Sequence, residues 1–314
     1  MFLDAGKYIF YFLVFPGFIF TLAVGLISVW IDRKVTARVQ WRVGPPPGQP
    51  LYDILKLLGK ETIVPKNSNK TLFLSAPLVG LGSVTIVSVI LWLASVYKIS
   101  FVGDLFVVVY LLMLPSLSLM IGGMASGNPM AATGANREMK LILAYELPFL
   151  LCLAIVIIKS GISINMVDLA GNHVMGSISG VLAFLISLLC IQAKLGFTPF
   201  DIAEAETEIM EGPYIEYSGV PLALFKITQA MLLFTLPVYL ISVFLGGLNF
   251  RGLGILWTVL KYVAILVVII VIKNTNPRLR IDQALKFFWR FLTPAGIVAL
   301  VLAIIGHISG IDWL

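Results

Sequence analysis

Acidic side chains are concentrated in one short stretch of the chain. Six of the 16 Asp and Glu residues lie there, and no Lys or Arg interrupts them: Asp201, Glu204, Glu206, Glu208, Glu211 and Glu216. Like charges at this spacing raise one another's pKa toward neutrality, and such carboxyl groups suit a proton relay or a cation pathway. The stretch is equally consistent with an acidic loop that is solvated or that pairs with basic residues of a partner. If Ile202–Met210 is helical, Glu204 and Glu208 share a face and Glu206 points elsewhere.

A single carboxyl group stands inside a long apolar run. Glu146 lies in the sequence LILAYELPFLL, and a charge at bilayer depth costs roughly 2.5–3.5 kcal/mol on insertion scales. We therefore expect a carboxyl group in this position to have a functional role. Lys226 and Lys261 also fall within apolar runs, so one of them could pair with Glu146, or either could extend to the membrane surface. The position of Lys226 near the end of its run favours the second interpretation.

Three more charged residues stand at the ends of apolar runs. Arg137 and Glu138 precede the run that contains Glu146, where capping or pairing within the helix competes with a functional role. Lys194 follows a later run, and we expect it to anchor the end of that helix rather than to take part in transport. Glu138 and Lys194 nevertheless stay among the candidates for ion coupling.

Few residues of this chain could hold a metal or a redox group. There are two Cys and two His, and no two of them have metal-ligand spacing: Cys152, Cys190, His173 and His307. Iron–sulfur clusters need several thiolates and zinc sites need about four ligands, and no phosphate-binding loop or dinucleotide fingerprint occurs. We therefore predict no catalytic residue, no metal and no cofactor here, and we assign any redox centre to a partner chain.

The composition places these charges in a membrane protein. Of the 314 residues, 59% are hydrophobic and 12% are charged, whereas soluble domains have about 45–50% and about 25%. This excludes a water-soluble enzyme, a disordered chain and a disulfide-stabilised secreted domain. The net charge of +6 does not indicate nucleic-acid binding, because the basic residues lie between apolar runs. Windows of about 20 apolar residues predict an all-α membrane domain over 1–314, with eight spans near 8–31, 72–97, 105–123, 139–158, 178–193, 220–245, 253–272 and 294–308.

Basic residues lie mainly on one side of the predicted spans. The loops 32–71, 124–138, 194–219 and 273–293, with the adjoining helix ends, carry sixteen Lys and Arg, whereas the other side carries four. The positive-inside rule therefore puts these longer loops in the cytoplasm and both termini outside the cytoplasmic membrane. Within them, Gln49–Glu61 and Ile281–Phe291 set apolar against charged residues at helical spacing, which predicts short amphipathic helices at the membrane interface.

Two segments resemble those of a known family. The segment DRKVTARVQWRVGPPPGQPLYDILKLLGKE after the first span and the segment TPFDIAEAETEIMEGPYIEYSG between the fifth and sixth spans resemble the heel subunit of respiratory complex I. Arg137 followed by Tyr145 and Glu146 is a weaker third match. The order and spacing of all three agree over most of the chain.

The resemblance implies a non-catalytic membrane subunit that joins a peripheral redox arm to antiporter-like pumping subunits. It places the acidic loop 198–218 and Glu146 on a hydrophilic path from the redox site into the membrane. Residues at the arm contact would be Asp32, Arg33, Lys34, Arg42, Asp53, Lys56 and Arg137. Expected partners are peripheral iron–sulfur and hydrogenase-like large subunits and antiporter-like and small membrane subunits, with any Fe–S or Ni–Fe centres held by those partners.

One departure from the family pattern bears on the electron acceptor. Quinone-reducing members tend to read Ala-Glu-Thr-Asn-Arg before Thr-Pro-Phe-Asp, whereas this chain reads AKLGF over 193–197. The exchange of a carboxylate for the ammonium of Lys194 inverts the local charge. The pattern is more similar to the ferredoxin-linked branch, the membrane-bound [NiFe]-hydrogenases and sulfur-reducing relatives of archaea. The alternatives are a quinone-site subunit, a stand-alone cation or proton transporter, and a passive membrane anchor.

Overall fold

The computed structural model describes residues 2–250, 252–311 and 313, without the side chains at 2–5, 8, 206 and 207. Over the described residues the chain is all-helical, which confirms the predicted fold class. The α-helices are α1 (Phe2–Leu13), α2 (Phe18–Val39), α3 (Gln49–Leu58), α4 (Lys70–Trp92), α5 (Asp104–Ala125), α6 (Pro129–Lys159), α7 (Met166–Leu169), α8 (Ile178–Lys194), α9 (Glu206–Ile209), α10 (Gly219–Phe244), α11 (Gly254–Thr275), α12 (Ile281–Phe287) and α13 (Thr293–Ser309). Short π and 3-10 turns are η1 (Leu93–Tyr97), η2 (Val174–Gly176), η3 (Gly212–Tyr214) and η4 (Phe288–Leu292).

Seven helical segments of the described chain are long and apolar enough to cross a membrane. They correspond to seven of the eight predicted spans. The remaining one is α8, an apolar helix of 17 residues, which at 1.5 Å per residue is about 26 Å long. It is therefore only slightly shorter than the hydrocarbon layer, and the count of eight spans stays a prediction.

The first predicted span, 8–31, is interrupted in the structure. Helix α1 ends at Leu13 and α2 begins at Phe18. Pro16 cannot donate a helical hydrogen bond, and a Cβ on Gly17 would lie 1.8 Å from the carbonyl oxygen of Phe12. The chain therefore has to turn at this point before the helix can resume.

Two helices extend further than predicted into the charged loops. Helix α2 continues to Val39, so Asp32, Arg33 and Lys34 belong to a helix and not to a loop. Helix α6 begins at Pro129, ten residues before the predicted span, so that Glu138 lies well inside it. Apolar content marks where a helix meets lipid, but a helix continues into water until residues such as Pro or Gly end it. The predicted amphipathic helices are present as α3 and α12.

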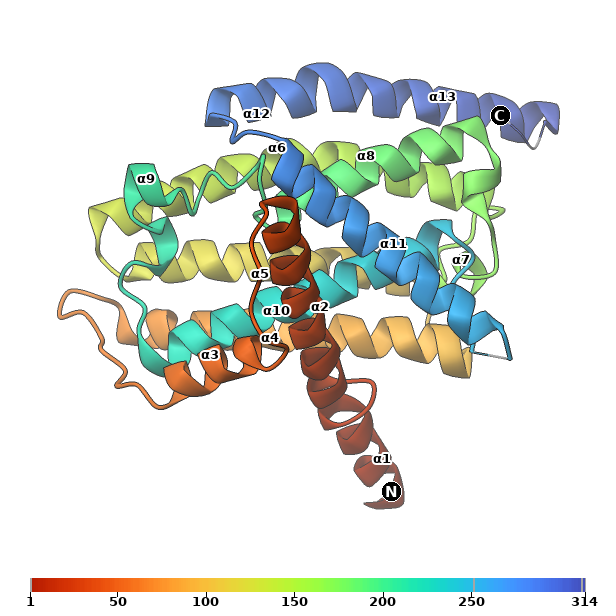
Figure 1. Cartoon of the computed structure of the whole chain (residues 1–314). Coiled ribbons are helices and arrows are strands. Elements are labelled where there is room, and N and C mark those ends of the chain that lie inside the picture. The colour runs from red at the N-terminus through yellow and green to blue at the C-terminus, as the bar shows by residue number, and fades with distance from the viewer. Residues whose placement is uncertain (1, 251, 312, 314) are drawn as a thin grey trace.

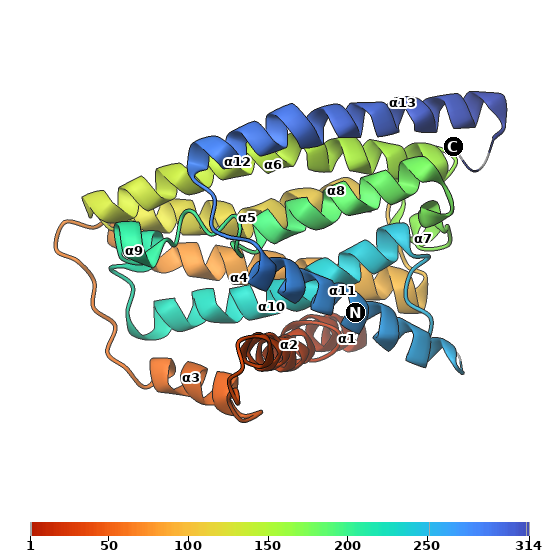
Figure 2. The same ribbon diagram turned by 45° about the horizontal axis from the view of Figure 1, so that its top comes forward.

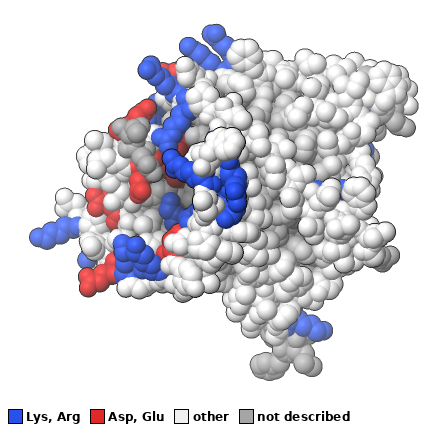
Figure 3. All heavy atoms as spheres, in the orientation of Figure 1, with Lys and Arg blue, Asp and Glu red and all other residues white. Residues whose placement is uncertain are grey.

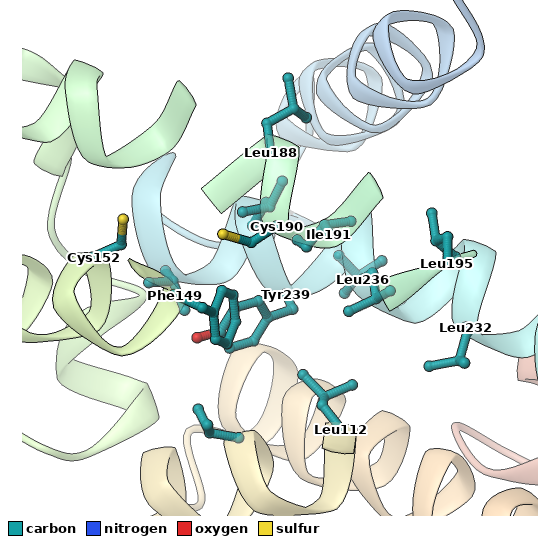
Figure 4. Packing of buried hydrophobic residues seen from close by; sticks show 14 of the residues in the cluster. Leu112, Phe149, Cys152, Leu188, Cys190, Ile191, Leu195, Leu232, Leu236 and Tyr239 are labelled. Carbon is teal, nitrogen blue, oxygen red and sulfur yellow. The ribbon is translucent and has the colours of Figure 1, made fainter. Parts of the chain in front are cut away.

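The helices pack side by side around a buried centre (Figure 1 and Figure 2). Helix α10 is the most enclosed, with 94% of its apolar window buried, whereas the windows of α11 and of α12–α13 are 28% buried. Helices α4 and α5 pack against each other, as do α6 and α8, and α13 covers both α6 and α8. Figure 4 shows part of the core, where Phe149, Cys190 and Tyr239 lie among Leu and Ile side chains.

Charged side chains gather at one end of this bundle. In Figure 3 the basic and acidic atoms lie mostly over the end where α3, α9 and α12 are found, and the remaining surface in view is largely uncharged. This end carries the loop that follows α8. The asymmetry along the helix axes agrees with the sequence pattern from which the orientation was predicted.

Candidate functional site

A charged cavity lies under the acidic loop at this end of the bundle. Its volume is about 40 Å³, enough for about three water molecules. Helices α5, α6, α8 and α10, the loop after α8 and η3 all contribute to its walls. The polar side chains of the lining are Ser116, Glu138, Lys194, Asp201, Glu204, Tyr214, Thr228 and Gln229.

Glu204 points into the cavity from a non-helical part of the loop. It accepts a hydrogen bond from Gln229 Nε2 at 3.3 Å, and Gln229 belongs to α10. Burial raises the pKa of Glu204 to about 7, with Asp201 adding to the rise and Lys226 opposing it. Burial likewise raises the pKa of the neighbouring Tyr214 well above its usual value. Glu204 can therefore gain or lose a proton near neutral pH.

Lys194 joins the cavity to the interior of the bundle. Its amino group donates to Glu146 Oε2 at 2.9 Å, and the two side chains are 2% and 16% exposed. The same amino group lies 5.0 Å from the ring centre of Tyr145 and 4.8 Å from that of Phe149, where a cation is attracted to the aromatic faces.

This ion pair corrects two expectations. The partner of Glu146 is neither Lys226 nor Lys261 but Lys194, and Lys194 turns inward instead of anchoring its helix at the surface. The reason is geometric. Helices α6 and α8 pack against each other, and burial leaves each of the two charges with the other as its nearest compensation.

Apolar side chains pack on the interior side of this ion pair. Phe149 lies one turn beyond Glu146 on α6, and its ring centre is 5.9 Å from that of Tyr239. Figure 4 shows both rings together with Leu112 and Leu236. An apolar core of this kind excludes water, and Glu146 is joined to the cavity through its ion pair with Lys194.

Toward the surface, the cavity adjoins a larger pocket of about 340 Å³. The two share Asp201 and Ile202 in their linings. Asp201 binds Arg278 at 2.7 Å, and Arg137 binds Glu208 at 2.5 Å across the same pocket. The surface and the cavity therefore meet at the Asp201–Arg278 pair.

The acidic side chains of the loop do not form a single cluster. Glu204 and Glu208 do not share a helix face, because the helix over Ile202–Met210 that this alignment required is not formed: α9 covers only Glu206–Ile209, and Glu204 precedes it. Glu216 accepts a hydrogen bond from Asn128 Nδ2 at 2.6 Å, and Glu211 is exposed with a positive φ of 69°. The side chain of Glu206 lies outside the described residues.

The two lysines predicted inside spans have other partners. Lys226 is exposed and lies 4.7 Å from the ring centre of Tyr214. Lys261 donates to the backbone oxygen of Leu245 at 2.7 Å, at the C-terminal end of α10, where a cation offsets the helix dipole.

The residues expected at a contact with a redox arm fall into two groups. Asp32 is buried and accepts from Lys273 Nζ at 2.7 Å. Arg33 binds Asp53 at 2.6 Å, and both side chains are exposed. Partial burial by itself would raise the pKa of Asp53, but hydrogen bonds from Arg33 and Gln49 outweigh it and hold that pKa below its usual value.

The remaining residues of this set are more accessible. Arg42 and Lys56 are exposed and Lys34 is half-buried. The loop between α2 and α3 also presents Trp41, which is 98% exposed. These side chains can meet a partner without any change in the fold.

Four side chains of the site were missed at the sequence level: Tyr214, Gln229, Lys273 and Arg278. A signal existed for Gln229, which is a polar residue inside the apolar run 220–245. Tyr214, Lys273 and Arg278 lie in loops or at helix ends, where their types are common and carry no signal. In the part of the chain that the structure describes, no three His, Cys, Asp or Glu side chains converge as a metal site.

Comparisons with known proteins agree over nearly the whole chain. The family profile described as NADH dehydrogenase matches residues 12–304. The NADH-quinone oxidoreductase of Geobacillus kaustophilus contains one subunit that is 33% identical over 296 residues, covering 90% of this chain and 89% of that protein. The corresponding subunit of Geobacillus thermodenitrificans is 32% identical, covering 88% and 87%.

A solved structure is similar to this fold as well. A chain of the membrane-bound sulfane sulfur reductase, an archaeal respiratory membrane complex, superposes with a TM-score of 0.82 at 30% sequence identity. The match covers 91% of this chain and 96% of the other.

Proposed function

Since the chain belongs to the NADH dehydrogenase family of membrane subunits, we propose that its charged cavity couples redox chemistry in a partner to ion movement in the membrane. The chain is a non-catalytic membrane subunit of a multisubunit, redox-driven, ion-translocating complex, as the resemblance implied. One observation supports the coupling role above all. Lys194 lines the cavity under the acidic loop and at the same time binds Glu146 inside the bundle.

Proton transfer follows from the order of the groups. The Asp201–Arg278 ion pair lies at the surface end of the cavity, and Glu204 and Glu138 line it. The Lys194–Glu146 ion pair lies at its inner end. Water in the cavity bridges groups that are too far apart for a direct hydrogen bond. A change in the partner that moves Arg278 from Asp201 alters the field at Glu204, and Glu204 responds because its pKa lies near neutrality. The charge on Glu204 in turn determines whether the ammonium group of Lys194 points toward the cavity or toward Glu146.

We further propose that the electron acceptor is not a quinone. Lys194 occupies the place where quinone-reducing relatives tend to have Glu, and here its ammonium is buried against Glu146 and two aromatic rings. Similarity to a chain of the sulfane sulfur reductase supports a ferredoxin-linked, sulfur-reducing or hydrogenase type of complex. The partners would then be iron–sulfur and hydrogenase-like large subunits at the charged end, and antiporter-like and small membrane subunits along the helices.

The charged end would face the cytoplasm. The sixteen Lys and Arg of the longer loops support this orientation in the cytoplasmic membrane. The exposed side chains of the α2–α3 loop and the pocket around Arg278 then form the contact surface for the redox arm.

Ion uptake by the complex in sealed vesicles tests the coupling role. Glu204→Gln and Glu146→Gln are compared with Lys140→Gln, which removes an exposed charge from α6 outside the cavity. We expect the first two variants to assemble, to keep electron transfer and to lose at least tenfold in ions moved per electron. Lys140→Gln should match the wild type.

Each alternative has its own outcome. Wild-type ion movement by assembled Glu204→Gln and Glu146→Gln complexes would indicate a passive anchor. Ion movement by the isolated chain in liposomes would indicate a stand-alone transporter. Reduction of quinone in place of protons or sulfur compounds by the purified complex would contradict the assignment of the acceptor.

A further inference from the structure

A buried carboxyl group lies at the end of the bundle opposite the acidic loop, where Figure 1 shows α7. Asp104 is the first residue of α5, and its exposed fraction is 0%. Its Oδ1 accepts a hydrogen bond from the backbone N–H of Met166 at 2.8 Å, which fastens the start of α7 to the start of α5. Its Oδ2 is also buried, and no described residue donates to it. One oxygen of this carboxyl group is therefore bonded, and the lone pairs of the other are unused.

A second buried oxygen without a partner belongs to Asn165. This residue is the N-cap of α7, but its side chain makes no capping hydrogen bond, although Asn at this position ordinarily accepts from the first helical turn. Asn165 Oδ1 is buried, and it too has no donor among the described residues. Asn165 directly precedes Met166, whose N–H binds Asp104. The two unused oxygens therefore lie at the same turn of the chain.

A third oxygen ligand stands beside them. Asp168 in α7 is exposed, and it lies close enough to Asp104 for the two negative charges to repel each other. Ser163 Oγ donates to Asp168 Oδ2 at 2.6 Å and restrains this side chain. Two carboxyl groups and one amide oxygen thus lie around the start of α7, and Asp168 adds to the negative charge of Asp104 instead of compensating it.

A metal cation satisfies this arrangement better than water does. Buried charges in proteins are paired or coordinate metals, and a water molecule can donate hydrogen bonds but leaves the negative charge uncompensated. Carboxylate and amide oxygens are the ligands that Ca²⁺ prefers, and Ca²⁺ accepts flexible geometry, whereas Mg²⁺ demands a near-ideal octahedron. Ligands from two separate segments of the chain, one of them a loop with a single helical turn, suit the more tolerant ion.

We propose that Asp104, Asn165 and Asp168 bind a calcium ion, which joins the start of α5 to the segment between α6 and α8. With two carboxylates the dissociation constant should be on the order of 10⁻⁴–10⁻³ M, as in extracellular modules, and this end of the bundle is the one predicted to lie outside the cytoplasmic membrane. The spacing of Cys and His did not predict the site, because its ligands are all oxygens. None of the three residues lines the charged cavity, so the site does not depend on the proposed ion-coupling role.

Calcium binding by the assembled complex tests the proposal. The complex is purified in detergent with EGTA, and the binding of radioactive calcium and the thermal unfolding midpoint are measured as CaCl₂ is added. Asp168→Asn removes an exposed ligand, and Glu61→Gln is the control, because it removes an exposed carboxylate far from the site. We expect calcium to raise the midpoint of the wild type and of Glu61→Gln equally. Asp168→Asn should assemble and bind calcium at least about tenfold more weakly.

Asn165→Asp separates a calcium site from an internal hydrogen bond. A third carboxylate should strengthen calcium binding and lower the midpoint in EGTA, because three negative charges then repel one another. If the amide of Asn165 instead donates to Asp104, the variant loses stability and calcium does not restore it, which would overturn the proposal. A wild type whose midpoint does not respond to calcium, or equal calcium binding by the wild type and Asp168→Asn, would show that Asp104 serves only to hold α7 against α5.

Discussion

Lys194 at the end of α8 donates to Glu146 in the middle of α6 over 2.9 Å. The two residues are 48 positions apart in the sequence, and no other described ion pair has a partner as deeply buried as Lys194. Taking two charges out of water costs several kcal/mol per ion, which the mutual attraction repays only while both are present. The pair can therefore be tested for two separate roles, in stability and in ion coupling.

The first prediction concerns the loss of one or both partners of this pair. Lys194→Met leaves Glu146 buried without compensation and should destabilise the chain by about 3–5 kcal/mol. The double variant Lys194→Met/Glu146→Gln should recover most of that loss while ion movement stays absent. Thermal unfolding of the purified complex, followed by ion uptake in vesicles, measures both. A double variant that pumps like the wild type would limit the pair to a structural role.

The second prediction concerns the protonation of Glu204. Its pKa is raised from 4.5 to about 7, chiefly by burial, so the folded state favours the protonated form. The resulting stabilisation is fully present below about pH 4.5 and is lost as the pH rises to about 7. Infrared difference spectra should show a carboxylic acid band that disappears with a midpoint near pH 7 and that is weaker in Glu204→Gln than in the wild type.

Glu208→Gln is the matched control for that measurement. Glu208 belongs to the same loop, but its side chain is 56% exposed and paired with Arg137. The band should persist in this variant. A wild type without the band at pH 5 would show that Glu204 is already ionised there and would remove it from the proton path.

The third prediction compares two ion pairs that hold α2. In the Lys273–Asp32 pair the side chains are 27% and 9% exposed, whereas in the Arg33–Asp53 pair they are 42% and 40% exposed. Asp32→Asn should lower the free energy of unfolding by about 1–3 kcal/mol, and Asp53→Asn by less than about 1 kcal/mol. Thermal midpoints of the detergent-solubilised chain give the order. Equal losses would contradict the assignment of burial as the cause.

The all-helical membrane fold could be predicted from the sequence because lipid imposes a compositional requirement. A spanning helix must satisfy its backbone internally and present apolar side chains, so the spans and the short helices α3 and α12 were visible as patterns. The ends of α2 and α6 were not visible, since Asp32 and Glu138 continue a helix as well as they form a loop. The break at Pro16 was hidden because the residues around it remain apolar.

The sequence pointed to several residues that line the candidate cavity, but it did not indicate which of them form ion pairs. Glu146 and Glu204 were recognised because a carboxyl group in an apolar run or in a dense acidic stretch is unusual. The choice of Lys194 as partner depends on how α6 and α8 rotate and approach each other, which no local spacing contains. Glu204 separates from Glu208 because the loop turns before α9, and this turn depends on packing against α10.

The last prediction concerns the contact between α6 and η3, where the acidic loop packs on the bundle. Gly134 of α6 lies against η3, where an added Cβ would be 2.7 Å from Pro213 Cδ and 2.9 Å from Gly212 Cα. Gly134→Ala should push this turn away, destabilise the chain by about 1–3 kcal/mol and speed proteolytic cleavage within 201–216. Gly82→Ala is the control, because a Cβ there meets nothing within 4 Å and Ala stabilises a helix by about 0.5–1 kcal/mol. If both variants are cleaved at the wild-type rate, contact with Gly134 does not hold the loop over the cavity.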